Sequence, residues 1–453
     1  MANTPTTSNT GANDGKNWLD RTLSLFSDVH AGEGVSALVL AANVFALLAF
    51  YYILKTVRES LILTEGGAEV KSYAAAGQAL LLVAVIPAYG AIAARVNRVR
   101  LISSVSLFFA SHLVIFYLLG VAGVKIGVAF YLWIGIFNLV IIAQFWSFAN
   151  DIYNNERGKR LFPLVGLGAS LGAWVGALIA SEIFAAVGPY RLLILSAVGL
   201  SACVLPTLWV DRRERARTPA SGKADAPIAR KGGFRLVFSN RYLFLIAMLV
   251  VVLNVVNTVG EFILSKLVVA YAAGTVASGT AGGLKEGAII GQFYGDFFAW
   301  VNLLGFLFQL LLVSRIFKHI GVRGALFILP LIATFSYGML AALPILAIVR
   351  ISKILENSTD YSIQNTARHA LFLPTSREAK YNAQQAIDSF FWRTGDLLQA
   401  VVVYIGVQLS FGISGFAAVN LVLVMVWLAL VVGIGREYKK LTTSEPVEQA
   451  GAA

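Results

Sequence analysis

Apolar runs of helical length recur along the chain from Gly34 almost to Arg436, and short polar segments separate them. A run of about 20 apolar residues is long enough to cross the hydrocarbon of a bilayer as a helix. Every backbone amide inside hydrocarbon needs an internal partner, and the runs are continuous instead of alternating, so they predict helices rather than barrel strands. The pattern therefore predicts an all-α polytopic membrane protein with twelve spans, near residues 35–62, 72–94, 99–120, 127–153, 161–187, 190–210, 241–271, 288–314, 324–343, 345–367, 382–409 and 414–435.

The longest polar break divides these spans six and six. We predict an N-terminal tail over 1–33, a six-helix bundle over 34–210, a basic linker over 211–240, a second six-helix bundle over 241–436 and a tail over 437–453. The halves echo one another at an offset of about 220 residues: Arg157-Gly158-Lys159 follows the fourth span, and Arg377-Glu378-Ala379-Lys380 follows the tenth. Two parallel six-helix repeats are the layout of major facilitator superfamily carriers, which bind their solute between the halves.

Basic residues indicate the orientation of the spans, because loops on the cytoplasmic side of a membrane are enriched in Lys and Arg. One set of alternate loops is rich in basic residues, whereas the predicted outer loops hold only Lys71, Lys125, Arg191 and Lys285. We therefore expect both termini in the cytoplasm, with the chain in a bacterial inner membrane. Short positive loops also account for the net charge of +12, so the charge gives no support to nucleic-acid binding.

Composition and motifs exclude several classes of protein. Only 13% of the residues are charged, about half the share found in soluble domains, so the chain is not expected to be a soluble enzyme. The sequence has no phosphate-binding Gly-x-x-x-x-Gly-Lys loop, which excludes a primary pump. No cofactor or metal is expected, because the four histidines lack ligand spacing: they are His30, His112, His319 and His369.

Charged residues within the first span are the first candidates for a binding site. Lys55, Arg58 and Glu59 are spaced to share one helical face, and two cations beside one anion suit phosphate or carboxylate oxygens. An ionised side chain in hydrocarbon costs roughly 2.5 to 3.5 kcal/mol, so a shared face favours a wet cavity. The alternative is that these side chains extend to the membrane interface.

The seventh span carries a polar stripe on an otherwise apolar helix. Asn254, Asn257, Glu261 and Ser265 recur at steps of three and four residues, and such a stripe is not expected to face lipid. Lys266 follows the stripe and can pair with Glu261 or with the solute. The alternative is a structural seam between helices, since Asn and Ser also join membrane helices.

The tenth and eleventh spans supply the remaining candidates. Lys353 lies in the polar tenth span and is expected to support the site. Arg393 is the cationic candidate of the second half, and Asp388 and Asp396 are spaced to orient it.

Four segments resemble the ATP/ADP translocases of bacteria and plastids, a branch of the major facilitator superfamily. Tyr51 to Glu59 is similar to the family's first-helix motif, and Asn257-Thr258-Val259-Gly260-Glu261 is similar to its helix-seven stretch, which carries a functional glutamate. The other two similar segments are Phe145 to Asn150 with Arg160 to Gly168, and Asp360 to Asp388. The resemblance implies twelve helices, nucleotide exchange or ion-coupled uptake, and no enzymatic activity.

Two positions depart from the family pattern. The family's glutamate early in helix four would fall near Ile134, where Asn138 is the nearest polar residue. Arg393 matches the family's helix-eleven lysine only with a shift of a residue or two.

We therefore expect a secondary-active carrier of a small phosphate-bearing anion, with a nucleotide as the first choice. In it, Lys55, Arg58 and Arg393 would neutralise phosphates with help from Lys266, and Glu59 and Glu261 would hold the cations when the site is empty. One alternative is a carrier for a sugar phosphate, organic acid, peptide-like acid or drug on the same scaffold. Another is a non-transporting membrane sensor or assembly factor. A monomer in the lipid bilayer is compatible with each reading.

Overall fold

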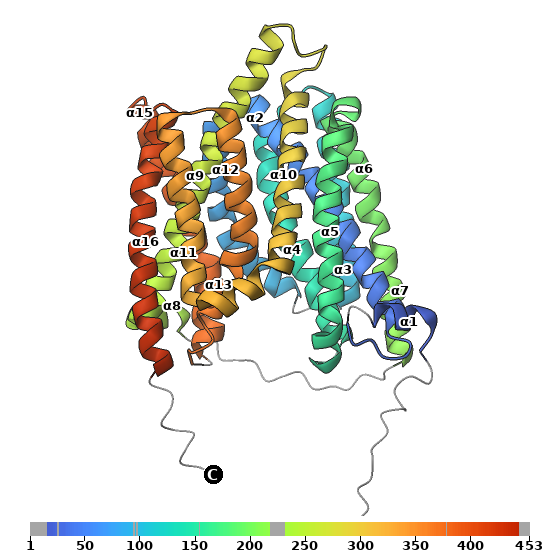
Figure 1. Ribbon diagram of the computed structural model, residues 1–453. Helices are drawn as coiled ribbons and strands as arrows, with labels where there is room; N and C mark the ends of the chain where they lie inside the picture. Colours follow the sequence, from blue (N-terminus) through green and yellow to red (C-terminus); the bar gives the residue numbers. More distant parts are fainter. Residues whose placement is uncertain are drawn as a thin grey trace, which may run out of the picture.

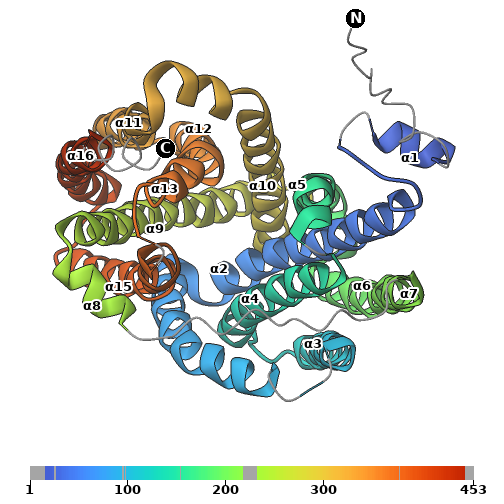
Figure 2. The same cartoon turned by 90° about the horizontal axis from the view of Figure 1, so that it is seen from below.

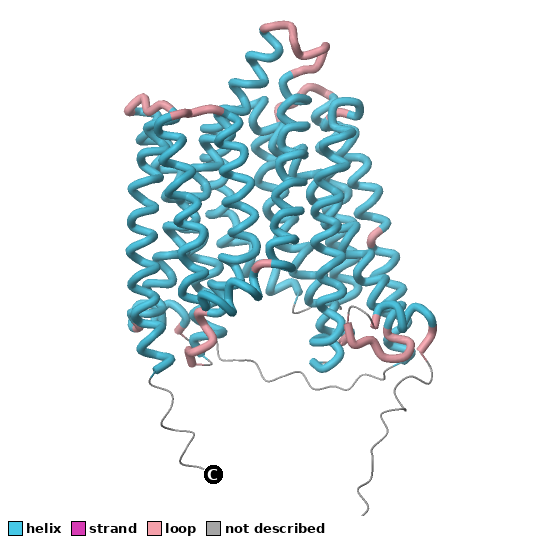
Figure 3. The backbone as a smooth tube through the Cα atoms, viewed as in Figure 1, coloured by secondary structure: helices cyan, strands magenta, loops and turns pink. Residues whose placement is uncertain are grey.

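The computed structural model describes residues 16–24, 27–93, 96, 98–153, 155–217, 232–376 and 378–443, and within these ranges the chain is helical with no strand (Figures 1 and 3). Nine of the described helices are long and apolar enough to cross a membrane, judged by length and composition. The helices run roughly side by side between two ends of the bundle (Figure 1). One end carries the α9–α10 loop, and the other carries α1 and the C-terminal end of α16.

The first part of the chain forms the helices on one side of the bundle. They are α1 (Trp18–Leu23), α2 (Gly34–Ala93), α3 (Arg98–Val121), α4 (Gly127–Ile152), α5 (Asn155–Val187), α6 (Pro189–Ala202) and α7 (Val204–Arg217).

Helix α2 contains both of the first two predicted spans. Its direction changes at Gly67, whose φ of 73° lies in the left-handed region that glycine adopts without steric cost. The turn therefore takes very few residues, and the predicted loop around Lys71 is helix instead. Placing Lys71 in an outer loop was wrong, because the chain resumes helical geometry directly after Gly67.

The second part of the chain forms the other side of the bundle. Its helices are α8 (Gly233–Ser239), α9 (Arg241–Ala277), α10 (Glu286–Leu311), α11 (Val313–Ala342), α12 (Leu346–Thr359), α13 (Asn365–Ala370), α14 (Gln384–Ala386), α15 (Trp392–Gln408) and α16 (Ile413–Thr443). Three segments have the wider π-helical turn, and they are η1 (Asp360–Gln364), η2 (Ala379–Ala383) and η3 (Ile387–Phe391).

Two predicted boundaries differ from the structure. The predicted loop between residues 314 and 324 is part of α11, which turns at Gly321 with φ 67°. The predicted linker over 211–240 is helical at both ends, where α7 and α8 lie, and residues 218–231 of it lie outside the described residues. The predicted tails 1–33 and 437–453 likewise lie partly outside them.

Two apolar cores hold the helices together. One is built from α1 to α7, and its largest buried side chains include Phe130, Phe137 and Phe184. The other is built mainly from α8 to α16 and also takes in Tyr52 of α2 and Tyr131 of α4. Seen along the bundle, α2 passes through its middle, with α5, α9 and α10 on one side and α4 on the other (Figure 2). The two parts of the chain therefore meet along α2 and where α5 packs against α10.

Glycines allow α5 to approach its neighbours closely. Gly168, Gly172 and Gly176 face the backbone carbonyl oxygens of α2, and a Cβ at any of these three positions would overlap that backbone. On the opposite side, Gly295 of α10 lies against the backbone of Ser181 in α5. Small residues at four-residue intervals are a common means of packing membrane helices, since lipid gives them no hydrophobic drive to associate.

Candidate functional site

The charged face of α2 lies in the middle of the bundle. The Arg58 guanidinium forms an ion pair with Glu59 and stacks over the Tyr131 ring of α4, 4.7 Å from its centroid. The Lys55 ammonium lies 4.2 Å from the centroid of the Phe298 ring of α10 and forms no ion pair with a carboxylate of the described residues. Aromatic faces attract cations, so these rings hold both side chains inside the bundle instead of at a membrane interface.

Lys71 connects this face of α2 to the polar stripe of α9. Its Nζ lies 2.7 Å from Glu59 Oε2 and 3.8 Å from Glu261 Oε2, and it donates a hydrogen bond to Ser265 Oγ at 3.0 Å. The Lys71 side chain is buried, as is that of Glu59. The structure thus brings Glu59 and Glu261, predicted from distant segments, to opposite sides of one lysine.

Lys71 was not included among the candidates, because polar residues and glycines interrupt the apolar run before it and the segment was interpreted as a loop. The signal that identifies it is Gly66-Gly67, which marks a tight turn and starts the next helix before Lys71. Because a charged side chain inside a membrane helix needs a partner, a helical Lys71 would have been included among the candidates.

Lys266 lies beside the cluster with a different partner. Its Nζ is 2.7 Å from Glu69 Oε1 of α2, and it also faces the Phe262 ring. The suggested pairing of Lys266 with Glu261 is therefore wrong: the two residues are too far apart around α9, since their spacing of five residues turns them to different faces.

The rest of the α9 stripe contacts α12 and α15. Asn254 Nδ2 donates to Asp396 Oδ1 at 2.8 Å, Asn257 Oδ1 accepts from Lys353 Nζ at 2.6 Å, and Glu261 Oε1 accepts from Asn357 at 3.0 Å. Each polar side chain of the stripe thus meets a polar partner on another helix, as expected for groups withdrawn from water.

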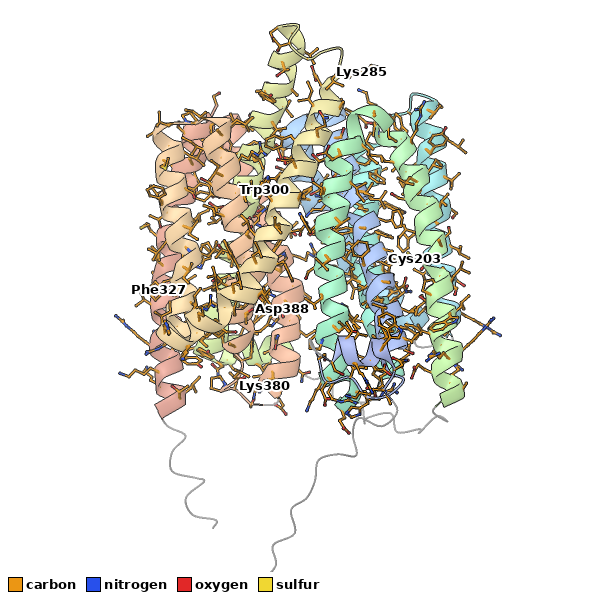
Figure 4. The ribbon with its side chains drawn as sticks, turned by 45° about the vertical axis from the view of Figure 1, so that its right-hand side comes forward. Cys203, Lys285, Trp300, Phe327, Lys380 and Asp388 are labelled. Atoms are coloured by element: carbon orange, nitrogen blue, oxygen red, sulfur yellow. The ribbon has the colours of Figure 1, made fainter. Side chains whose placement is uncertain are left out.

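Arg393 and its two predicted partners are separated. Arg393 pairs with Asp396 at 3.3 Å, as the spacing predicts. Asp388 instead lies 3.6 Å from Arg368, so the expectation that it orients Arg393 was wrong. Asp388 lies within η3, which ends at Phe391, and the wider π-helical turn rotates Asp388 relative to Arg393 away from the position that regular helix spacing predicts. Asp388 lies in the part of the bundle nearer Lys380 than Lys285 (Figure 4).

The charges of the central cluster do not balance. Lys55, Arg58 and Lys71 are three cations, and the two carboxylates that face them are Glu59 and Glu261. The other nearby cations each have their own carboxylate: Lys266 has Glu69, Lys353 has Glu356 and Arg393 has Asp396. One positive charge is therefore in excess, and it lies between helices from both parts of the chain.

The chain is similar in sequence to several proteins of known name. No family model matches the chain. ADP,ATP carrier protein 1 of Rickettsia bellii is 24% identical over 349 residues, which are 68% of this chain and 67% of that protein. ADP,ATP carrier protein 1 of Chlamydia trachomatis is 26% identical over 363 residues, which are 70% of this chain and 66% of that protein. The chloroplastic ADP,ATP carrier protein 1 of Arabidopsis thaliana is 23% identical over 351 residues, 69% of this chain and 54% of that protein.

The chain is a distant homologue of the ADP,ATP carrier proteins of bacteria and plastids. It matches about two thirds of the length of its bacterial relatives. These homologues are transporters and not enzymes.

Solved structures show the fold of this transporter homologue. The nucleoside transporter NupG superposes with a TM-score of 0.66 at 14% identity, over 89% of this chain and 99% of that one. A bacterial homologue of the iron transporter ferroportin gives 0.63 at 11% identity, over 88% and 98% of the two chains. A POT family transporter in complex with 5-aminolevulinic acid gives 0.60 at 13% identity, over 89% and 96%. The fold is that of the major facilitator transporters.

The structure also accounts for the missing helix-four carboxylate of this ADP,ATP carrier homologue. Ile134 is fully buried in the apolar core built from α1 to α7. Tyr131 of α4 stacks with Arg58, and the partly buried Asn138 follows Tyr131 about two turns later. No carboxylate of the described part of α4 therefore opposes the excess positive charge of the cluster.

Proposed function

We propose that this protein is a secondary-active, alternating-access carrier of phosphate-bearing anions, with nucleotides as its solutes. The observation that carries the proposal is the one positive charge in excess at the centre, on side chains that two halves of a major facilitator fold bring together. The distant homologues are named for the transport of ADP and ATP, which are anions of this class.

The carboxylates have a defined part in this proposal. Glu59 and Glu261 hold Arg58 and Lys71 while the site is empty, because unpaired charges withdrawn from water are costly. An arriving phosphate competes for the same cations, and arginine can bind two of its oxygens at once. Lys55 forms no ion pair among the described residues, so no ion pair has to break before it can bind the solute, and it is the first cation available. Arg393, Lys266 and the stripe residue Asn257 complete the proposed site.

We further propose that the chain crosses the inner membrane twelve times with both termini in the cytoplasm. Nine described helices have spanning length and composition, and α2 folds back at Gly67 to supply two of the crossings. The less apolar segments α12–α13 and η2–α15 would supply the other two. On this reading the halves are 34–210 and 241–436, and the α9–α10 loop is outside the cell.

Uptake by the full-length protein in liposomes tests the function. We expect uptake of labelled ATP and ADP that excess unlabelled nucleotide competes away and that glucose 6-phosphate and citrate do not. Arg58→Ala and Arg393→Ala should each reduce it by about tenfold or more, since a hydrogen bond to a charged group contributes roughly 1.5 to 3 kcal/mol.

Lys125→Ala is the matched control, because Lys125 is an exposed cation in the loop before α4. Full uptake by both arginine variants would remove their proposed roles. Uptake of a sugar phosphate or organic acid in place of nucleotides would identify a carrier on the same scaffold with a different solute.

A further inference from the structure

A small cavity lies behind the α9 stripe, inside the part of the bundle formed by α9, α11, α12 and α16. It has room for the centre of a water molecule over about 10 Å³, which is roughly what one water needs. Its polar lining is Asn257, Glu356, Asp360 and Trp427, and its apolar lining is Leu253, Val256, Leu329 and Ala333. Apart from Asn257, none of these side chains belongs to the solute site proposed above.

Two polar atoms of this lining are buried with no hydrogen-bond partner in the described part of the chain. They are Glu356 Oε1 and Trp427 Nε1, on side chains that are 4% and 2% exposed. Glu356 Oε1 is a hydrogen-bond acceptor and Trp427 Nε1 is a donor, so an apolar group in the cavity could not bond to either of them. A buried polar atom left unpaired costs about 1 to 3 kcal/mol, which indicates that something polar occupies the cavity.

The chemistry of the lining favours water over a metal cation as that occupant. A water can accept from the indole N–H of Trp427 and donate to carboxylate oxygens of Glu356 and Asp360, which provides the two to four bonds that buried waters make. A bound Na⁺ or Mg²⁺ would require a shell made of oxygen atoms, and the indole N–H presents a hydrogen to the cavity instead.

The charges around the cavity leave one carboxylate uncompensated. Glu356 Oε2 accepts from Lys353 Nζ at 3.1 Å and from the Tyr337 hydroxyl of α11 at 3.0 Å, so Glu356 has its cation. Asp360 has no ion pair among the described residues.

The other elements packed around Asp360 do not supply a free cation. Helices α10 and α11 both pack against η1, and α10 has no Lys or Arg from Glu286 to Leu311, nor has α11 from Gly324 to Ala342. Arg368 of α13 is in an ion pair with Asp388. Helix α9 contributes Asn257 and, through Asn357, the carboxylate of Glu261. Helix α16 has no ionisable side chain from Ile413 to Gly435. Two carboxylates against one lysine therefore leave a negative charge in excess, which one proton would cancel.

We propose that Asp360 and Glu356, bridged by a water held on Trp427, form a proton-binding site that couples solute movement to a proton. The proton arrives as hydronium from one side and passes through the bridging water to a carboxylate oxygen, and after the carrier opens to the other side it is transferred to a water molecule there, so that the carboxylate is left as it began. Lys353 links this site to the solute site, because its ammonium is shared between Glu356 and Asn257 of the α9 stripe. The inference rests on the proposed function and names its coupling ion.

Asp360 also lies at a position where the helix departs from regular geometry. It is the first residue of η1, and α12 ends directly before it. Single π-helical turns inside α-helices occur frequently at functional sites.

Infrared spectroscopy of the purified full-length protein tests the proton site without any solute. We expect wild type near neutral pH to show the carbonyl stretch of a protonated carboxylic acid, and Asp360→Asn to lose that band. Trp427→Phe keeps an aromatic side chain of smaller size and removes the N–H, so it should shift the pH at which the band titrates. Asp211→Asn, at a carboxylate paired with Arg215 on α7, should leave the band unchanged. A band that persists in Asp360→Asn overturns the inference.

Transport against a pH gradient tests the coupling, with labelled ATP as the probe. With one pH unit of gradient, acid outside, we expect wild type and Asp211→Asn to accumulate ATP by up to about tenfold, since one pH unit for one proton corresponds to that ratio. Asp360→Asn should show no gradient-driven accumulation, while its melting temperature and its stabilisation by ATP show that it is folded. Accumulation by Asp360→Asn equal to that of wild type would overturn the inference.

The two proposals fail in different ways. Wild type that does not take up ATP but keeps the Asp360-dependent infrared band refutes nucleotide transport and supports the proton site. Wild type that takes up ATP independently of the pH gradient and lacks the band refutes the proton site and supports nucleotide transport.

Discussion

At the scale of single residues, the central cations differ in what holds them. Arg58 and Lys71 have carboxylate partners, whereas Lys55 is held by the rings of Tyr52 and Phe298. Rings attract a cation without cancelling its charge. The excess charge of the cluster is therefore best assigned to Lys55.

Lys55→Ala should reduce uptake of labelled ATP in liposomes by about tenfold or more, since it removes one charged contact with the solute. Lys55→Arg keeps the charge and should retain most of the activity. The melting temperature should change little in either case, because no carboxylate of the described residues depends on Lys55. Equal activity of Lys55→Ala and wild type would contradict the assignment.

Lys71 is expected to contribute to stability as well as to transport. Lys71→Met would leave Glu59 and Glu261 without a cation that both now contact, and breaking a buried pair by removing one partner costs about 3 to 5 kcal/mol. We expect a markedly lower melting temperature in detergent. Adding Glu261→Gln should recover part of the loss, because Glu59 keeps its ion pair with Arg58 whereas Glu261 is the carboxylate left without a cation. A double variant less stable than Lys71→Met alone would argue against this pairing.

Glu33 makes stability depend on pH at the end of the bundle that carries α1. Burial by itself would raise the pKa of Glu33, but the hydrogen bonds from Arg160 and from the His30 backbone, with the charges of Arg160 and Arg157, outweigh it and lower the pKa below the ordinary 4.5. A carboxyl with a lowered pKa in the folded state stabilises it fully above the ordinary value, and this contribution is lost as the pH falls through the folded value.

We therefore expect the melting temperature of wild type to fall below about pH 4.5 by more than that of Glu33→Gln. Above that pH, Glu33→Gln should be the less stable of the two, because it lacks the ion pairs with Arg157 and Arg160. Parallel pH profiles for the two proteins would show that Glu33 does not act in this way.

At the scale of elements, the contact between α2 and α5 depends on close approach of two backbones. Gly172 faces the carbonyl oxygen of Phe45, whereas Gly166 of the same helix has open space where a Cβ would lie. Comparing alanine variants at these two positions therefore distinguishes the effect of tight packing from the intrinsic helix propensity of alanine.

Gly172→Ala should destabilise the protein by about 1 to 3 kcal/mol, the usual cost of overpacking a tight contact. Gly166→Ala should be neutral or slightly stabilising, because alanine is favoured over glycine within helices. Thermal unfolding of both variants in detergent measures the difference. If Gly172→Ala is as stable as Gly166→Ala, the two helices are not in close contact.

At the scale of the whole molecule, the two parts of the chain are joined towards the end that carries the α9–α10 loop. Ser60 Oγ donates to the carbonyl oxygen of Gly287 at 2.6 Å, and Lys71 joins Ser265. Gln399 donates to Ser72 Oγ at 3.0 Å, and Lys266 pairs with Glu69. An alternating-access carrier has to separate such contacts to open on that side.

A disulfide across this end should therefore block transport. A Cβ on Gly287 would lie 3.3 Å from Ser60 Oγ, so Ser60→Cys with Gly287→Cys places two thiols within bonding reach. We expect oxidation to abolish ATP uptake by the double variant and a reductant to restore it. Each single variant is the control, since native Cys203 is buried elsewhere. Undiminished uptake by the cross-linked protein would show that these contacts need not separate.

The sequence by itself determined that this chain is helical and lies in a membrane, because hydrocarbon allows few other ways to satisfy the backbone. It also predicted Arg58, Glu59 and Glu261 as candidates for the site, since an ionisable residue within an apolar run is unusual whatever the fold. The similarity of four segments to a transporter family required no coordinates either.

Only the tertiary structure decided which charges meet. Lys71 joins Glu59 to Glu261 because Gly67 turns α2 back within one residue, and Asp388 pairs with Arg368 because η3 alters the spacing of its helix. The cavity at Glu356 and Trp427 is made by helices far apart in the sequence. Local sequence patterns show which face of a helix is polar. The partner of each polar group depends on how helices far apart in the sequence pack together, and a local pattern does not contain that information.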